Sequence, residues 1–210
     1  MPALLSGLSV PMGVIVVLSL GGCYSTSPQG VGTPVLGCDG QTYVTPDESP
    51  YVLPYAVGAS FETGLTNCSS SYHASGNPDQ YAFDFRMPSG TEFIAARAGK
   101  VFRVVEDQPS LGGGDGAGNY VIIDHLDGTF GLYYHSPMNG IAVEVGDDVQ
   151  HGTVLGVTGR SGLAGYPHLH FIVVQGNPSY PYDGLAISFR NARPDDIVLE
   201  GGKTYEAGPH

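Results

Sequence analysis

Apolar and polar residues alternate over short stretches of this chain, and the stretches are separated by Gly, Pro, Asp and Asn. A period of two is typical of half-buried β-strands, because successive side chains of a strand point to opposite faces. Residues 120–124 and 129–134 flank an Asp127-Gly128 step, a dipeptide typical of a tight hairpin turn. No long stretch has the convincing period of an amphipathic helix. We therefore predict an all-β fold with a mostly antiparallel sheet.

The chain begins with an apolar run over residues 13–20, which is followed by Gly21-Gly22-Cys23. Small residues before a cysteine resemble a bacterial lipobox, and the run is too short for a membrane-spanning helix. We therefore expect residues 1–22 to be a lipoprotein signal peptide, with Cys23 acylated after cleavage. Residues 1–22 contain neither Lys nor Arg, whereas signal peptides usually begin with positive charge.

Composition divides the rest of the chain into two parts. Residues 23–49 are rich in Ser, Gly, Thr and Pro and lack apolar periodicity, so they are predicted to be a lipid-anchored tether. Residues 50–206 are predicted to form one domain, which is long enough to bury a single core. Residues 185–191 are a further strand-like stretch near the end of this domain.

Cysteine count and charge bear on the compartment and the partners. If Cys23 carries lipid, Cys38 and Cys68 remain as a candidate disulfide in an oxidising compartment; the alternative is two free thiols in a reducing one. The formal net charge is −12, from 20 acidic against 8 basic residues. This charge argues against nucleic acid as a partner and against electrostatic docking on anionic lipid. The chain is thus predicted to be a membrane-anchored lipoprotein of the cell envelope, outside the cytoplasm.

A pair of histidines, His168-Leu169-His170, stands at the head of an apolar run. In a strand, residues two apart project from one face, so the two imidazoles are predicted to lie side by side, as in a metal site. A chance pair on a solvated face is the alternative. Asp84 lies between two aromatic residues in another strand-like stretch, where a carboxylate is out of place unless a partner compensates its charge.

Two more histidines, His73 and His135, bring the candidates to four imidazoles and a carboxylate. This set is larger than one ion needs. A catalytic zinc site typically takes three protein ligands and leaves one position open, while further histidines beside it can move protons. The count therefore favours a hydrolase over a closed structural site, but it does not name a substrate.

The remaining histidines are not expected to take part in chemistry. His125 precedes the predicted hairpin turn, His151 lies in a turn beside a glycine, and His210 is the last residue. Tyr133 is predicted to share a strand face with His135, two residues later. We expect Tyr133 to be a packed aromatic; stabilisation of an oxyanion through its hydroxyl is the alternative.

Seven sequence blocks, in this order, resemble the lysostaphin-type, or LytM-type, zinc peptidases that cut peptidoglycan. The blocks are His73, residues 81–85 (YAFDF), 87–91 (MPSGT), 95–101 (AARAGKV), 118–125 (GNYVIIDH), 132–135 (LYYH) and 168–171 (HLHF). Residues 145–159, with paired glycine turns, are similar to the same family. The resemblance covers roughly residues 50–175 and implies an antiparallel sheet with a groove that holds zinc.

Transferred residue by residue, the resemblance implies that His73, Asp84 and His170 are zinc ligands. It implies that His135 and His168 are the catalytic histidines, which take a proton from water and deliver one to the leaving amine. One departure from the family's commonest pattern concerns the first ligand. That pattern has three residues between the first histidine and the aspartate, whereas this chain has ten.

Three functions are compatible with these features. The favoured one is a zinc endopeptidase that hydrolyses peptide bonds in peptidoglycan cross-links or stem peptides, because every position transferred from the family holds the expected residue. The second is a catalytically silent module of the same fold that binds cell-wall peptides or regulates another hydrolase. The third treats residues 143–159 as half of a biotinyl- or lipoyl-like module, which leaves the His and Asp set unexplained and lacks a Met-Lys-Met carrier site.

Overall fold

The computed structural model describes residues 37–109 and 116–210. The predicted signal peptide, Cys23 and the first part of the predicted tether lie outside the described residues. Short strands and two single-turn 3-10 helices make up the regular structure. They are η1 (Pro46–Glu48), β1 (Ser60–Glu62), η2 (Ser71–His73), β2 (Phe83–Phe85), β3 (Glu92–Ile94), β4 (Gly99–Val105), β5 (Asn119–Asp124), β6 (Thr129–Ser136), β7 (Asp148–Val149), β8 (Val154–Val157), β9 (Leu169–Gln175), β10 (Asp183–Gly184), β11 (Ala192–Arg193) and β12 (Thr204–Ala207).

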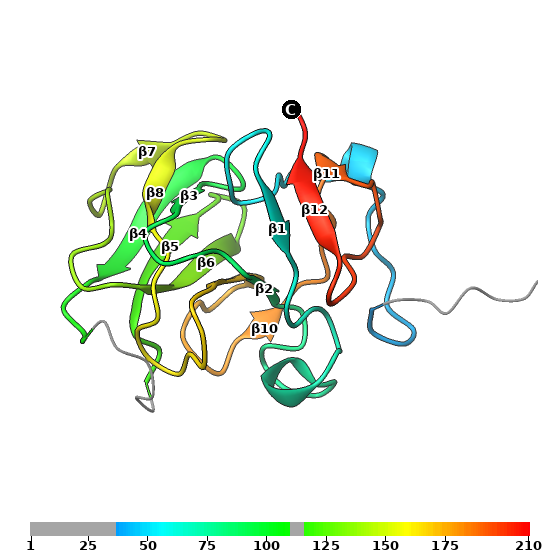
Figure 1. The fold of residues 1–210 in the computed structure, drawn as a ribbon, viewed down its shortest axis with the longest axis horizontal. Helices are drawn as coiled ribbons and strands as arrows, with labels where there is room; N and C mark the ends of the chain where they lie inside the picture. The colour runs from blue at the N-terminus through cyan, green and yellow to red at the C-terminus, as the bar shows by residue number, and fades with distance from the viewer. Residues whose placement is uncertain (1–36, 110–115) are drawn as a thin grey trace, which may run out of the picture. The chain divides into compact units, whose positions relative to one another are not determined.

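The strands form one large sheet and two small ones. The large sheet has the order β10-β9-β6-β5-β4-β7, and β2 pairs with the β9 strand as a seventh member. The strands β1, β12 and β11 form a second sheet, in which β1 and β12 run side by side (Figure 1), and β3 pairs with β8. All of these pairings are antiparallel. The prediction of an all-β, antiparallel fold is therefore confirmed.

The predicted hairpin is also present, because β5 pairs with β6 across the Asp127-Gly128 turn. Gly128 has a φ of +87°, a backbone conformation that favours glycine. No α-helix occurs among the described residues. Within the same residues, no helix is long and apolar enough to cross a membrane.

The central strand β9 is buried on both of its faces. Leu169, Phe171 and Val173 point into an aromatic-rich core, whereas Ile172 and Val174 pack in a smaller cluster on the other face. Truncation of a fully buried aromatic such as Phe171 to Ala typically costs about 3 to 5 kcal/mol of stability. The face of β9 that carries Ile172 and Val174 is also the one from which His170 projects, since these residues are two apart. The candidate site thus stands on a strand that the core holds rigidly.

The strand expected over residues 185–191 is not formed. This segment is irregular. The Leu185 N–H at its start still donates to the Val173 carbonyl in β9 at 2.8 Å, but later groups bond to the N-terminal part of the described chain. The Ser49 hydroxyl donates to the Ser188 carbonyl at 2.5 Å, and the Arg190 N–H donates to the Tyr51 carbonyl at 3.0 Å. Because these bonds go to isolated partners, no ladder can form; the strands β10 and β11 lie on either side of the segment.

The described residues before Pro50 are joined to the rest of the molecule by covalent and polar contacts. Cys38 and Cys68 form a disulfide. The Ser188 hydroxyl donates to the Val44 carbonyl at 2.6 Å. The disulfide fixes the start of the loop that precedes β2, and this loop carries His73.

Candidate metal centre

Two strands place the first part of the site. Asp84 in β2 lies directly opposite His170 in β9, and residues opposite each other in an antiparallel pair point to the same face. The Asp84 Oδ1 atom is 2.9 Å from His170 Nδ1. His168, immediately before β9, brings its Nε2 atom to 3.6 Å from the same oxygen. The predicted side-by-side placement of His168 and His170 is therefore what the structure shows.

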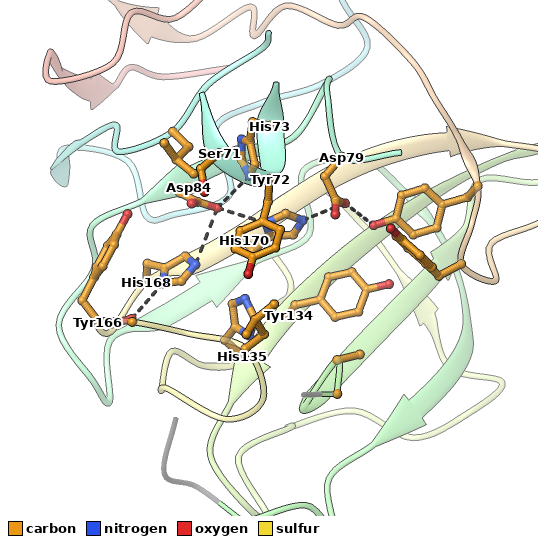
Figure 2. Close-up of a pocket in the computed structure, with 17 residues that line it drawn as sticks. Ser71, Tyr72, His73, Asp79, Asp84, Tyr134, His135, Tyr166, His168 and His170 are labelled. Atoms are coloured by element: carbon orange, nitrogen blue, oxygen red, sulfur yellow. Dashed lines mark hydrogen bonds and ion pairs between the residues drawn. The ribbon is translucent and has the colours of Figure 1, made fainter. Parts of the chain in front are cut away.

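His73 reaches the site from a loop rather than from the sheet. It is the last residue of the short helix η2 and is almost fully buried. Its Nε2 atom lies 3.4 Å from Asp84 Oδ1. One carboxylate oxygen is thus surrounded by nitrogens from three imidazoles (Figure 2). The ten residues between His73 and Asp84 form a loop that leads back to β2 and brings the His73 side chain next to Asp84.

The donor set fits a zinc ion. Nitrogen or oxygen atoms of His73, Asp84 and His170 all lie within 4.8 Å of one another. Two imidazoles and one carboxylate are a common set of three protein ligands for catalytic zinc. Burial acts to raise the pKa of Asp84, but hydrogen bonds from His170 and His73 outweigh it and hold that pKa well below its usual range. A charged carboxylate among buried imidazoles is the arrangement that a cation would stabilise.

A second pair of histidines faces the same space. The rings of His135 and His168 are 4.7 Å apart between centroids. The Nδ1 atom of His135 lies 2.8 Å from the Ser161 carbonyl oxygen, and the Nδ1 atom of His168 lies 2.8 Å from the Tyr166 carbonyl oxygen. A carbonyl can only accept, so each Nδ1 carries the proton and each Nε2 is left free to accept one.

Burial keeps both of these imidazoles neutral. It lowers the pKa of His135 to about 3, assisted by repulsion from His168 and His170. Burial also lowers the pKa of His168, against the attraction of Asp84. Neutral histidines with free Nε2 atoms can act as proton acceptors at neutral pH.

His135 enters the site through a β-bulge. Asn119 pairs with Ser136 and Tyr120 pairs with Tyr134, so His135 is the extra residue in β6. It has a φ of +77°, which is uncommon for a residue other than glycine. A bulge of this kind redirects side chains, and as a result the adjacent residues Tyr134 and His135 both line the same cavity.

The expectation that Tyr133 shares a face with His135 is wrong, because the bulge interrupts the alternation between them. Tyr133 is fully buried in the aromatic core, and its hydroxyl accepts a hydrogen bond of 2.9 Å from the Ala96 N–H. The prediction that Tyr133 is a packed aromatic is thus confirmed. The tyrosine that reaches the cavity from β6 is its neighbour Tyr134.

The site opens into a cavity of about 580 Å³. Tyrosines contribute much of its wall, and two of them, Tyr72 and Tyr180, are well exposed at its rim. The remaining tyrosines in the lining are Tyr134, Tyr166 and Tyr182. A cavity of this size accommodates a segment of a peptide or a molecule of similar bulk. Sequence analysis did not identify these tyrosines. Four of them lie outside strands, where isolated aromatics carry no periodic signal, and Tyr134 lies in β6 beside a bulge that alternation does not predict.

Asp79 is a further site residue that sequence analysis missed. Its Oδ1 atom lies 3.4 Å from His170 Nε2, and the Tyr182 hydroxyl donates a short hydrogen bond to the same oxygen. Burial acts to lower the pKa of His170, but Asp79 and Asp84 outweigh it and raise that pKa to about 9. Asp79 lies in a turn between η2 and β2, where a carboxylate is common and gives no signal by itself.

The three other histidines lie away from the cavity. The His125 Nδ1 atom donates to the Ala98 carbonyl at 2.9 Å, and burial lowers the pKa of His125 to about 4. His151 contacts the Pro50 carbonyl oxygen through Nε2 at 3.0 Å, and its ring lies next to that of His210. None of the three lines the cavity that holds the four candidate histidines.

Residues 79–181 match the model of Peptidase family M23. The match includes Asp84, His135, His168 and His170, whereas His73 precedes it.

Two curated proteins are similar to parts of the chain. The peptidoglycan DD-endopeptidase ShyA of Vibrio cholerae is 34% identical over 96 residues, which are 45% of this chain and 20% of that protein. An uncharacterized metalloprotease of Buchnera aphidicola is 27% identical over 124 residues, which are 59% of this chain and 30% of that protein. The chain thus spans less than a third of the length of either relative.

A solved structure shares the fold. It is the catalytic domain of a mutant of the prophage-encoded M23 protein EnpA from Enterococcus faecalis, with 24% identity and a TM-score of 0.50. The similarity covers 64% of this chain and 94% of that one. The family model thus shows similarity to Peptidase family M23 over residues 79–181, and the solved structure shows a shared fold.

Proposed function

We propose that this protein is a zinc-dependent endopeptidase that hydrolyses peptide bonds in peptidoglycan, in its cross-links or its stem peptides. One observation carries the proposal: His73, Asp84 and His170 converge in an open cavity that also contains two histidines held by backbone carbonyls, His135 and His168. The family supports peptide hydrolysis, and the similarity to a protein named as a peptidoglycan DD-endopeptidase supports the substrate class.

In this proposal His73 Nε2, Asp84 Oδ1 and His170 Nδ1 hold the zinc ion. Zinc, when bound, supplies Lewis-acid polarisation of a peptide carbonyl and lowers the pKa of water. Three protein ligands leave room for water and substrate, as a catalytic site requires. The cavity in front of the ligands provides that room.

The two histidines beside the ligands have the proton-transfer roles. His135 and His168 each present an unprotonated Nε2, because the Ser161 and Tyr166 carbonyls hold the proton on Nδ1. One imidazole takes a proton as water attacks the peptide carbonyl, and the imidazolium formed in this way delivers that proton to the leaving amine. The backbone carbonyls orient both rings, so neither ring has to reorganise during the reaction.

The cellular location follows from the N-terminal features. We propose that residues 1–22 are a lipoprotein signal peptide, that Cys23 carries the lipid, and that residues 23–49 tether a peptidase domain over residues 50–206. The disulfide between Cys38 and Cys68 supports an oxidising compartment outside the cytoplasm. Peptidoglycan peptides and the membrane that holds the lipid are the partners in this proposal.

The test uses the chain from residue 24 onward, which keeps both disulfide cysteines and avoids the lipid. Zinc content is measured by elemental analysis, and digestion of purified peptidoglycan is followed by mass spectrometry, with and without a chelator. We expect about one zinc ion per chain and cleavage that the chelator stops; the masses of the products identify the bond.

Each other outcome contradicts a different part of the proposal. Zinc without cleavage would favour a module that binds cell-wall peptides or regulates another hydrolase. A folded protein without zinc would contradict the ligand assignment itself. Cleavage that persists after zinc is removed would contradict the metal mechanism.

A further inference from the structure

Asp79 and Tyr182 form a chain of contacts that ends on His170. The His170 ring has Asp84 at one nitrogen and Asp79 at the other: Nδ1 is 2.9 Å from Asp84 Oδ1, and Nε2 is 3.4 Å from Asp79 Oδ1. Tyr182 donates its hydroxyl hydrogen to the same Asp79 oxygen. Figure 2 shows this line of contacts running from Asp84 through His170 to Asp79 and on to a tyrosine.

The two residues come from different loops, and both are anchored. The Asp79 carbonyl accepts a hydrogen bond of 2.9 Å from the Ala82 N–H, which closes the turn before β2. Tyr182 immediately precedes β10, which pairs with β9, and its side chain is packed in the small apolar cluster on the same face of β9 as the site. The contact between Asp79 and Tyr182 therefore joins the loop before β2 to the loop after β9, across the ring of His170.

The four cavity histidines differ in the partner of the nitrogen that points away from the centre. The rings of His135 and His168 donate to neutral backbone carbonyls. The ring of His170 has a carboxylate, Asp79, as its outer partner. The outer nitrogen of His73 has no hydrogen-bond partner among the described residues. A charged acceptor behind an imidazole fixes its tautomer and makes the inner nitrogen a stronger ligand.

We propose that Asp79 is a positioning residue for the metal ligand His170, and that Tyr182 holds the Asp79 carboxylate in place. In the zinc-bound protein Asp79 keeps the proton of His170 on Nε2, so that Nδ1 offers its lone pair to the ion instead of a hydrogen bond to Asp84. Tyr182 occupies one lone pair of the Asp79 oxygen and limits rotation of the carboxylate. This inference rests on the proposed zinc site and adds residues that touch neither zinc nor substrate.

The test measures zinc affinity directly, independently of peptidoglycan cleavage. Competition with a chromogenic chelator gives the zinc Kd of the wild-type protein and of Asp79→Ala, Asp79→Asn and Tyr182→Phe. Loss of such an outer partner typically weakens metal binding about 10- to 100-fold, which is the expectation for Asp79→Ala. Asp79→Asn should lie between Asp79→Ala and wild type, because its amide oxygen can still accept from Nε2. Tyr182→Phe should weaken zinc about two- to tenfold, the net worth of one hydrogen bond.

Two controls separate positioning from stability and from charge. Asp148→Ala removes an exposed carboxylate that pairs with Lys100 at the far edge of the sheet, so it changes the net charge equally. Its zinc Kd should match that of wild type. Long-range proton and nitrogen NMR of the zinc-loaded proteins follows the Nε2 proton of His170, whose protection a merely structural role of Asp79 would not change. Because Nδ1 binds zinc in both proteins, we expect a slowly exchanging Nε2 proton in wild type and a faster exchanging one in Asp79→Ala, which lacks the acceptor.

A zinc Kd for Asp79→Ala within twofold of wild type would overturn the positioning role and leave the proposed function intact. The same conclusion follows if Asp79→Asn binds zinc no better than Asp79→Ala, since an oxygen acceptor at residue 79 would then be irrelevant. A wild-type protein that binds no zinc would overturn both proposals. If Asp79→Ala fails to fold, Asp79→Asn and Tyr182→Phe are judged by the same twofold limit.

Discussion

The two halves of the candidate metal centre are held by different kinds of structure. We call Asp84, His168 and His170 the strand half, because they lie on or directly beside β2 and β9. His73 and Asp79 are the loop half, because they lie between residues 66 and 82. Backbone pairing sets the strand half, in which Asp84 stands directly opposite His170. The loop half depends on isolated turns, a three-residue helix and a disulfide.

The two halves therefore differ in how easily their side chains can be displaced from the site. In the strand half, moving one ligand would require slipping the register of a sheet, which turns every side chain of the strand to the other face. In the loop half, local turns, the short helix η2 and the disulfide keep His73 at the site, and regions of this kind open at lower free energy than a central strand. We therefore expect the strand half to be rigid with or without metal. We expect the loop half to become rigid only when its turns and disulfide are intact and the ion is bound.

The largest effect should come from removing one ligand in either half. We expect His170→Ala and His73→Ala each to lower zinc content from about one ion per chain to near zero and to abolish peptidoglycan cleavage, because two remaining ligands do not hold catalytic zinc. Elemental analysis after dialysis measures the metal, and the digestion assay measures activity.

His125→Ala is the matched control, since it removes a buried imidazole that does not line the cavity. It should keep zinc. If His73→Ala also kept zinc, the loop half would contain no ligand, and the strand half would have to hold the ion with His168 or His135. Zinc retained by His170→Ala would contradict the assignment in the strand half.

The same division explains what the sequence could predict. The alternation of apolar and polar residues around His168-Leu169-His170 and around Asp84 predicted two strands, each with its polar side chains on one face. The pairing of β2 with β9 confirms the strands and brings these faces together. His73 was predicted through resemblance to a family, because no local pattern relates a loop residue to a strand ten residues later. Asp79 and Tyr182 meet only through tertiary contact between two loops; an aspartate is ordinary in a turn, and a single tyrosine in a loop has no periodic signal.

The error over Tyr133 and His135 has a local cause. Alternation predicts the face of each side chain only while every residue of a strand is paired, and the bulge at His135 breaks that condition. The irregular path of residues 185–191 has a similar origin, because Ser188 exchanges hydrogen bonds with Ser49 and Val44 instead of a neighbouring strand. Both are contacts between distant parts of the chain that an apolar pattern does not encode.

An intermediate effect should follow from loosening the loop half alone. The disulfide joins residues 30 apart, and closing a loop of that length stabilises a protein by about 3.5 kcal/mol in the chain-entropy estimate. We expect the double substitution Cys38→Ser with Cys68→Ser to lower the free energy of unfolding by up to this amount and to weaken zinc binding, because His73 is five residues from Cys68. Urea unfolding and chelator competition measure the two effects.

Leu155→Ala serves as the comparison for that variant. Leu155 is a fully buried residue of β8, and its truncation typically costs about 2 to 5 kcal/mol, a similar loss of stability away from the loop half. Its zinc affinity should remain that of wild type. Equal zinc affinity in the disulfide variant and in wild type would show that the turn hydrogen bonds position His73 without the disulfide.

The smallest effect on stability concerns His135, a strand residue with a conformation typical of loops. Its φ of +77° disfavours residues with a Cβ atom by about 1 to 2 kcal/mol relative to glycine. His135→Gly should therefore unfold at a higher free energy than His135→Ala, by about 1 kcal/mol. At Tyr134, the preceding residue outside the bulge, the order should reverse, because glycine in a regular strand is less stable than alanine by about 0.5 to 1 kcal/mol.

Both His135 variants should keep zinc and lose turnover about 10²- to 10⁴-fold, the usual contribution of a proton-transfer residue. Chemical unfolding of the four variants, with zinc content and digestion rate measured on the same samples, tests stability and chemistry together. If His135→Ala and His135→Gly have equal free energies of unfolding, the bulge relaxes once the imidazole is removed. The side chain of His135, and not the backbone, would then maintain the bulge. Full turnover in either variant would exclude His135 from proton transfer, and loss of zinc would make it a ligand, which would extend the metal centre from β9 to β6.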